Sequence, residues 1–214
     1  MWKEYAPEPR MRLNLGIRRR LAPLLDNDQR KIELAHSLLF TLPGSPVLYY
    51  GDEIGMGDNI WLPDRNGVRT PMQWNSEPDA GFSDVPAQSL YAPIINDDVY
   101  VPAHTNVQSQ RQDPNSLWNT LRQMIRIRAE HHAFGWGEFE WIDLENDNIA
   151  GFQRNFEGEV ILAIHNLSDS EQRIILKTKK SVKSLTDLLS RKVFDSKNGR
   201  VEIDLAPYQY LWLK

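Results

Sequence analysis

The feature that most constrains the fold is a short apolar run, Ser45-Pro46-Val47-Leu48-Tyr49-Tyr50, which lies between Pro43-Gly44 and Gly51. An apolar run of this length between turn residues is typical of a strand buried in a parallel sheet. Two carboxylates, Asp52 and Glu53, follow the run directly. The carboxyl ends of parallel barrel strands are where functional side chains are placed. The run therefore predicts a buried strand with candidate functional groups at its end.

The residues before this run predict helices. Residues 10–42 have a helical pattern that Pro23 interrupts, and Asp26 and Asn27 are candidate caps for a second helix. The apolar positions of that second helix fall on one face: Ile32, Ala35, Leu38, Leu39 and Leu42. We expect it to end at Pro43-Gly44. A helix, a short turn and a buried strand make half of a βαβ unit, which implies a parallel sheet.

Residues 51–112 predict a long loop, because they are rich in Pro, Gly, Asn and Asp and show no sustained period. A loop of this length is usually either functional or disordered. Its aromatic and arginine side chains favour an ordered, functional loop. Asp113-Pro114 then predicts a helix start, since Asp caps helices and Pro is favoured at the first helical position. Apolar residues at helical spacing continue this helix to about His131.

The remainder of the chain predicts a small antiparallel β-sandwich, because the hydrophobic period changes to two after Gly135 and Gly137. A tight turn at Glu157-Gly158 indicates a hairpin. The expected strands are residues 149–156, 159–166, 172–176, 201–205 and 208–213. We therefore place a domain boundary after residue 134, which gives domains 1–134 and 135–214.

Composition excludes several classes of protein. With 214 residues, 25% charged residues and a net charge of −4, the chain has neither a disordered composition nor the basic surface of a nucleic-acid-binding protein. No apolar run approaches the ~20 residues of a membrane span. Cysteine is absent, and the five histidines show no metal-ligand spacing. We expect a cytoplasmic protein without a bound metal or cofactor and without nucleic-acid or membrane partners.

Arg65 and Arg69 are candidate ligand-binding residues on the long loop. They are separated by Asn66-Gly67, which is a turn signal. The arginine fork can hold a carboxylate and a hydroxyl group together. An isolated surface arginine more often forms a salt bridge. Within the string Arg69-Thr70-Pro71-Met72-Gln73-Trp74, however, an aromatic ring and an amide accompany the guanidinium, and this combination favours a hydroxyl-rich ligand for Arg69.

Three segments carry a resemblance to a known family. Residues 9–24, 51–60 and 64–74 closely resemble the trehalose synthase branch of glycoside hydrolase family 13. Related oligo-1,6-glucosidases share the string from Arg69 to Trp74 but place a much longer insert before it. The resemblance extends over the whole chain and is weakest in the predicted sandwich. It implies a fold class of α/β plus all-β: the C-terminal portion of a (β/α)8 barrel, followed by a small antiparallel β-sandwich.

The resemblance implies an enzyme, an isomerase that interconverts maltose and trehalose by retaining intramolecular transglucosylation. The family uses an Asp nucleophile, a Glu acid/base and a stabilising Asp in an Asn-His-Asp motif. None of these motifs occurs in the sequence. The chain therefore resembles a carboxyl-terminal fragment that we expect to be inactive alone, and it contains no residue to which a catalytic role can be assigned. The expected partners are maltose, trehalose and the missing amino-terminal barrel portion.

Four residues take roles from the resemblance. Arg69 matches the family arginine that, with an Asp from early in the barrel, closes the pocket for the non-reducing glucose. Arg65 is expected to line the same pocket mouth. Asp52 and Glu53 cannot both address one glycosidic bond, because successive residues of an extended strand point to opposite sides. We expect a supporting role for this acidic pair.

Two other kinds of function stay open from the sequence. The parent enzyme could be a hydrolytic α-glucosidase or oligo-1,6-glucosidase, which product analysis would distinguish from an isomerase. Alternatively, the chain could be a non-catalytic sugar-binding or structural module that uses the loop aromatics Trp61, Trp74 and Tyr91. Millimolar maltose binding without turnover would favour that module.

Overall fold

The computed structural model describes the backbone of residues 1–214 and every side chain except that of Ala87. The chain forms two compact units. The first contains Met1–Ile32 and Val47–Leu121, and the second contains Glu33–Pro46 and Arg122–Lys214. Two of the three divisions fall within helices, α3 (Gln29–Thr41) and α5 (Leu117–Glu130), and the third lies between Pro46 and Val47. The domain boundary expected after residue 134 stays a prediction.

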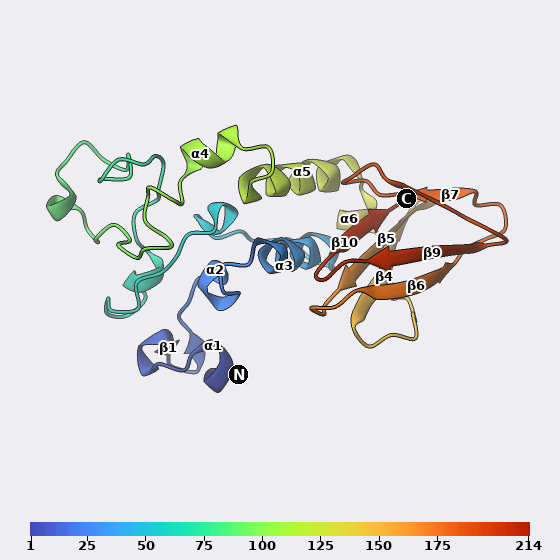
Figure 1. Ribbon diagram of the computed structural model, residues 1–214, viewed down its shortest axis with the longest axis horizontal. Helices are drawn as coiled ribbons and strands as arrows, with labels where there is room; N and C mark the ends of the chain where they lie inside the picture. Colours follow the sequence, from blue (N-terminus) through green and yellow to red (C-terminus); the bar gives the residue numbers. More distant parts are fainter. The chain divides into compact units, whose positions relative to one another are not determined.

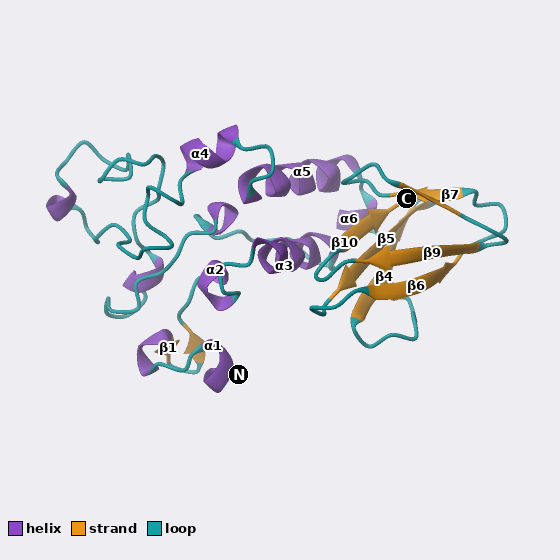
Figure 2. Cartoon of the chain, in the orientation of Figure 1, coloured by secondary structure: helices purple, strands orange, loops and turns teal.

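The first unit is built from short elements joined by irregular chain (Figures 1 and 2). Apart from the ends of α3 and α5, its elements are α1 (Trp2–Tyr5), η1 (Pro9–Met11), β1 (Arg12–Leu13), β2 (Gly16–Ile17), α2 (Leu21–Leu24), η2 (Asp52–Ile54), η3 (Asn66–Val68), η4 (Ala87–Ser89) and α4 (Val107–Gln112), where η marks a 3₁₀ turn. The long loop predicted for residues 51–112 is confirmed, with α4 at its end.

The helical pattern of residues 10–42 predicted too much helix. The α-helices of this segment are α3 and the four-residue α2, and residues 12–17 form the two-residue ladder of β1 and β2 instead. The turn between these strands needs a positive φ at Asn14, which is 54°. Arg18 then donates to the backbone oxygens of Arg10, Ile60, Leu62 and Asp64. These contacts with residues far along the sequence override local helix propensity.

The segment 45–50, predicted as a buried strand, is neither a strand nor buried. No described residue pairs with it in a ladder, and Val47 is 81% exposed. A parallel strand needs neighbours on both sides for its backbone N–H and C=O groups, and layers above and below for its apolar side chains. The described residues of this chain provide neither. The apolar pattern was therefore recognised correctly, but its partners are absent.

The long loop is ordered by a small core and by buried polar contacts. Ile54, Met56, Met72 and Val107 form the core, and Trp118 packs against it. The Gln73 side chain is fully buried and donates from Nε2 to the Tyr100 carbonyl oxygen at 2.9 Å. Asn106 caps α4, since its Oδ1 accepts from the Ser109 amide at 2.8 Å. The loop is therefore held at several points along its length.

The second unit is an antiparallel sandwich, as predicted (Figure 1). One sheet has the strand order β10-β5-β4-β3, and two further pairs are β6-β9 and β7-β8. Apart from the ends of α3 and α5, the elements are α6 (Ala133–Trp136), β3 (Glu138–Trp141), β4 (Ile149–Phe156), β5 (Glu159–Asn166), β6 (Gln172–Lys177), β7 (Ser184–Thr186), β8 (Val193–Asp195), β9 (Arg200–Leu205) and β10 (Tyr210–Leu213). The short strands β3, β7 and β8 were not predicted, because three or four residues show too little alternation.

The sandwich core contains side chains from the four-stranded sheet and from both two-stranded sheets. Ile164 on β5, Ile203 on β9 and Phe194 on β8 belong to one buried apolar cluster. Burial of apolar side chains from facing strands is the main stabilising contribution in such a sandwich. Because β4 and β5 pair along their full lengths, from Ile149–Asn166 to Phe156–Glu159, they form its longest hairpin.

Two arginines of the second unit, the buried Arg154 and the half-buried Arg128, bind the end of α3. Arg154 is only 2% exposed and donates to the Thr41 carbonyl oxygen and the Gly137 carbonyl oxygen, each at 2.9 Å. Arg128 donates to the carbonyl oxygens of Phe40 and Gly44. The carbonyls of Phe40 and Thr41 belong to the last turn of α3 and that of Gly44 follows it, where intrahelical donors are missing, whereas Gly137 is the residue after α6. The two cations also match the negative end of the helix dipole.

In the part of the chain that the structure describes, no helix has both the length and the apolar character needed to cross a membrane.

Candidate functional site

The turn after the apolar run positions the first acidic residue. Gly51 and Gly55 flank η2 and have φ values of 86° and 68°, which a residue with a side chain rarely adopts. A Cβ at Gly51 would also lie 2.5 Å from the Met56 sulfur atom. The glycines therefore let the chain reverse tightly, and Asp52 is brought to a buried arginine.

That arginine is Arg20, whose side chain is only 1% exposed. Its Nη1 donates to the Tyr50 carbonyl oxygen at 2.6 Å and lies 3.5 Å from Asp52 Oδ1. The guanidinium also lies over the rings of Tyr49 and Tyr50, 5.1 and 4.9 Å from their centroids. Among the described residues, Nε and Nη2 of Arg20 have no partner although both are buried. Such donors normally find an acceptor, so this guanidinium retains binding capacity.

Asp52 and Glu53 differ in their surroundings. Burial raises the pKa of Asp52, while the charge of Arg20 and its hydrogen bond act in the opposite direction. Glu53 is half-buried and forms no ion pair with a described residue. Asp52 therefore carries the electrostatic pairing with Arg20, and Glu53 does not share it.

Arg69 is held through its backbone. Its carbonyl oxygen accepts from the Tyr91 hydroxyl at 2.6 Å, and the Thr70 carbonyl oxygen accepts from the Tyr50 hydroxyl at 2.9 Å. Burial is the main cause that raises the pKa of Tyr50, so its phenol stays protonated and donates. The Arg69 side chain is exposed and makes no ion pair or hydrogen bond with a described residue. The backbone is fixed while the guanidinium stays available.

Tyr50 connects the two parts of the predicted site. Its carbonyl oxygen binds Arg20, next to Asp52, and its hydroxyl binds the backbone beside Arg69. Arg65 is exposed at the start of η3 and has no such link to the cluster through the described residues. Sequence reasoning missed Arg20 and Tyr50 as members of this site. The available signal was the position of Arg20 inside the family-like segment 9–24.

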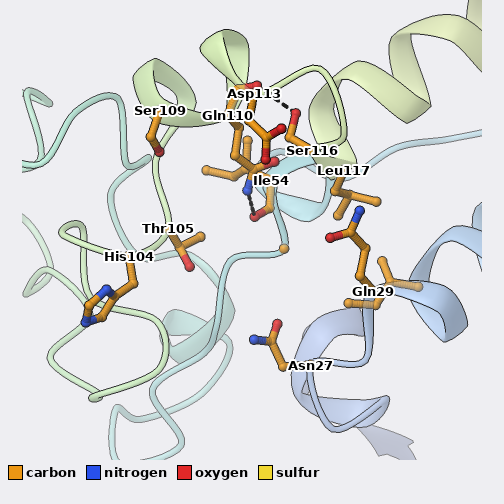
Figure 3. Close-up of a pocket in the computed structure, with 12 residues that line it drawn as sticks. Asn27, Gln29, Ile54, His104, Thr105, Ser109, Gln110, Asp113, Ser116 and Leu117 are labelled. Carbon is orange, nitrogen blue, oxygen red and sulfur yellow. Dashed lines mark hydrogen bonds between the residues drawn. The ribbon is translucent and has the colours of Figure 1, made fainter.

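A pocket of about 330 Å³, drawn in Figure 3, is lined by residues that include Ile54 and Gly55 at the end of the η2 turn. Its polar side chains mostly serve the local structure. Gln110 donates to the Ile54 carbonyl oxygen at 2.7 Å and accepts from the Trp118 amide, and Ser116 donates to the Gln110 carbonyl oxygen at 2.6 Å. These polar side chains of the pocket are therefore occupied by hydrogen bonds at the end of α4 and the start of α5. Among the described residues, no group of three potential metal ligands occurs.

Comparison with known proteins gives two family matches. Residues 17–137 match the family model of the α-amylase catalytic domain. Residues 139–212 match that of the maltogenic amylase C-terminal domain. The predicted order of a barrel portion followed by a β-sandwich is thereby confirmed.

Individual relatives agree with these matches. The sequence is 52% identical over 184 residues to a trehalose synthase of Pimelobacter sp. (strain R48), covering 84% of this chain and 32% of the relative. It is 50% identical over 179 residues to a trehalose synthase/amylase of Mycobacterium tuberculosis, covering 82% and 30%. The solved structure of an α-amylase from H. orenii has a TM-score of 0.70 at 24% identity, over 91% of this chain and 37% of that one.

These likenesses confirm the resemblance seen in residues 9–24, 51–60 and 64–74. The solved structure, at 24% identity, supports the fold alone. The chain spans about a third of the length of the curated relatives it matches.

Proposed function

The chain belongs to the α-amylase family, and from this premise we propose that it contributes the carboxyl-terminal part of an enzyme that interconverts maltose and trehalose. The observation that carries the proposal is the 52% identity over 184 residues to a protein named trehalose synthase. The reaction is a retaining, intramolecular transglucosylation. In it the glucosyl group leaves one hydroxyl of the second glucose and returns to another.

We place the catalytic carboxylates outside these 214 residues. A retaining reaction needs two carboxyl groups about 5 to 5.5 Å apart on either side of the scissile bond. Asp52 is engaged with Arg20, and Glu53 is its immediate neighbour on a tight turn. Neither arrangement provides a nucleophile with a separate acid/base. The partner that provides both is the amino-terminal barrel portion, on the same or a second polypeptide.

Arg69 binds the substrate in this proposal. Its guanidinium extends from a backbone held by two tyrosine hydroxyls and is free to bind a carboxylate and a sugar hydroxyl together. Arg65 lines the mouth of the same pocket. Asp52 supports the site by neutralising Arg20, and Glu53 supports the turn. Absence of cysteine agrees with our placement of the enzyme in the reducing cytoplasm.

Hydrolysis is the second candidate function. The M. tuberculosis relative is named trehalose synthase/amylase, which favours some transfer of the glucosyl group to water. An isomerase and a hydrolase use the same covalent intermediate and differ in which acceptor reaches it. Trehalose as the main product supports the isomerase, and glucose alone supports the hydrolase.

A chimera tests this proposal. In it, the chain replaces the matching carboxyl-terminal third of the Pimelobacter relative, and maltose products are separated by chromatography. We expect trehalose. Arg69→Lys should lower kcat/KM by roughly 100-fold, because lysine cannot make the paired hydrogen bonds of a guanidinium. Arg111→Lys, at an exposed arginine of α4 outside the proposed site, is the matched control and should change kcat/KM by less than about twofold. A folded chimera that releases only glucose, or no product, would refute the proposal that the enzyme is an isomerase.

A further inference from the structure

The first unit contains a second pocket, of about 250 Å³, on the long loop. Six of its lining residues bear on what it could bind: Arg19, Asp58, Trp61, Asn96, Asp97 and Tyr100. We call this the Trp61 pocket. It combines one large aromatic wall with polar groups at several positions. Such a combination suits a small ligand that has both an apolar face and hydroxyl groups.

Trp61 provides the apolar wall and is held in place. Its side chain is 71% exposed, although its backbone amide is fixed by a hydrogen bond to Asn59 Oδ1 at 3.0 Å. The Arg10 guanidinium lies over the indole, 4.3 Å from a ring centroid. The guanidinium contacts one face of the indole, and the high exposure of Trp61 leaves other ring surface available to a ligand. The C–H face of a pyranose ring is the complement of such a surface.

The charged groups of the pocket select for a neutral ligand. Asp58 has a side chain only 3% exposed and accepts from Arg19 Nε and from the Arg20 amide, both at 2.8 Å. This ion pair is therefore internally balanced. Among the residues that line the pocket, the exposed Asp97 leaves a net negative charge, which disfavours phosphorylated sugars; the Arg10 guanidinium over Trp61 is not one of the lining groups. Asn96 is exposed, and its amide makes no hydrogen bond with a described residue.

Tyr100 completes the pocket because Gly57 leaves room for it. A Cβ at Gly57 would lie 2.4 Å from the Tyr100 ring, so any larger residue would displace the ring. Burial, and then the charges of Asp97 and Asp58, raise the pKa of Tyr100 to about 12. The phenol therefore keeps its proton and can donate to a hydroxyl oxygen. Asp97 and Asn96 offer acceptors for sugar hydroxyl protons.

We propose that the Trp61 pocket binds one pyranose ring of a neutral glucoside, stacked on Trp61 and hydrogen-bonded to Asn96 and Asp97. The choice of a glucose ring rests on the proposed function, whereas the neutral, hydroxylated class rests on the pocket itself. The pocket holds about one ring by volume, so affinity is set by a single residue of the sugar. Such binding is expected at roughly millimolar concentration.

The test is an NMR titration of the full 214-residue chain with methyl α-D-glucopyranoside. We expect saturable shifts of the Trp61 indole N–H resonance and of the Asn96 and Asp97 backbone amide resonances, and the two amides are followed in every variant. Trp61→Ala should weaken binding by about tenfold, in line with the loss of one stacking contact. Trp136→Ala is the matched control, since Trp136 is 77% exposed and does not line the pocket, and it should bind like the wild type. Glucose 6-phosphate should bind more weakly than the neutral glucoside.

Several outcomes would overturn the inference: no saturable binding, equal affinity of Trp61→Ala and wild type, or equal binding of the phosphate. If Trp61→Ala does not fold, the variant Asp97→Asn replaces it. Asp97 is exposed, so its replacement should leave the fold intact and still weaken binding of the glucoside. The titration reads binding by the chain alone and involves no turnover. An inactive chimera therefore refutes the proposed function without touching this result, and absent binding refutes the pocket without touching the chimera.

Discussion

Acid should destabilise the second unit through one buried histidine, His165. Its ring is fully buried and stacks on Phe152. Its Nε2 lies 2.9 Å from Ser37 Oγ, which accepts from the Trp212 indole N–H at 2.8 Å. Its Nδ1 lies 3.4 Å from the Ala150 carbonyl oxygen. One arrangement satisfies every group: Nδ1 carries the proton, and the Ser37 hydroxyl donates to a neutral Nε2.

The magnitude follows from the pKa of this ring. Burial lowers the pKa of His165 from 6.5 to about 4. Above pH 6.5 the ring is neutral in the folded and the unfolded chain, so it adds no pH dependence. Below that pH the unfolded chain binds a proton that the folded chain refuses, and the free energy of unfolding falls. The loss is about 2 kcal/mol between pH 7 and pH 5, and about 3 kcal/mol once pH 4 is passed.

The assay is urea unfolding at pH 7 and pH 5, followed by the indole N–H resonance of Trp212, which belongs to the second unit. His165→Gln removes the titration, so its stability should be lower at pH 7 but should change little between the two pH values. His104→Gln, at an exposed histidine of the first unit, is the control and should behave like the wild type. If wild type and His165→Gln lose the same stability from pH 7 to pH 5, the reasoning is wrong.

Three further predictions concern stability and order. Arg154→Met should lower the free energy of unfolding by about 3 kcal/mol, because buried carbonyl oxygens lose their donors. In the same urea assay the control Arg173→Met, which removes an exposed ion pair, should leave the unfolding midpoint unchanged. Gly57→Ala should cost about 2 kcal/mol by displacing an aromatic ring, whereas Gly135→Ala, where a Cβ meets nothing within 4 Å, should not destabilise. Amides of residues 45–50 should exchange with deuterium roughly 1000-fold faster than those of the β4–β5 hairpin, and equal protection would contradict the structure.

Local chemistry explains why the hairpin could be predicted to the residue. Alternating side chains and the Glu157-Gly158 turn place both strand ends, and the structure has the positive φ values, 49° and 88°, that such a turn needs. All of this information lies within one continuous segment. The start of α5 was predicted wrongly: the helix begins at Leu117 and not at Pro114, and the Ser116 hydroxyl, instead of Asp113, accepts from the Asn119 amide at the helix start.

Partners distant in sequence explain the failures. The pattern of residues 10–20 favours a helix, but Arg18 binds carbonyl oxygens more than 40 residues away. The segment 45–50 has the composition of a buried strand, yet a strand exists only with neighbours to pair with. In both places the prediction from the local pattern was wrong, because the tertiary contacts that decide the outcome could not be read from that pattern.

The candidate site divides in the same way. Asp52 and Arg69 were predicted as site residues because they lie in family-like strings, and in the structure Tyr50 contacts the neighbourhood of each. Arg20 was missed because its importance depends on a carbonyl group 30 residues later. The Trp61 pocket was likewise not predicted from the sequence, because its lining residues come from separate segments. Trp61 itself was named among the loop aromatics of a possible sugar-binding module.

The most direct test of the central claim is a product assay of the purified chain alone with maltose, reading trehalose and glucose by chromatography. The account predicts neither product, because we place the two catalytic carboxylates outside these residues, and without them there is neither a covalent intermediate nor proton transfer. Formation of trehalose would contradict it. Asp52 and Glu53, to which we give supporting roles, would then be the first residues to replace.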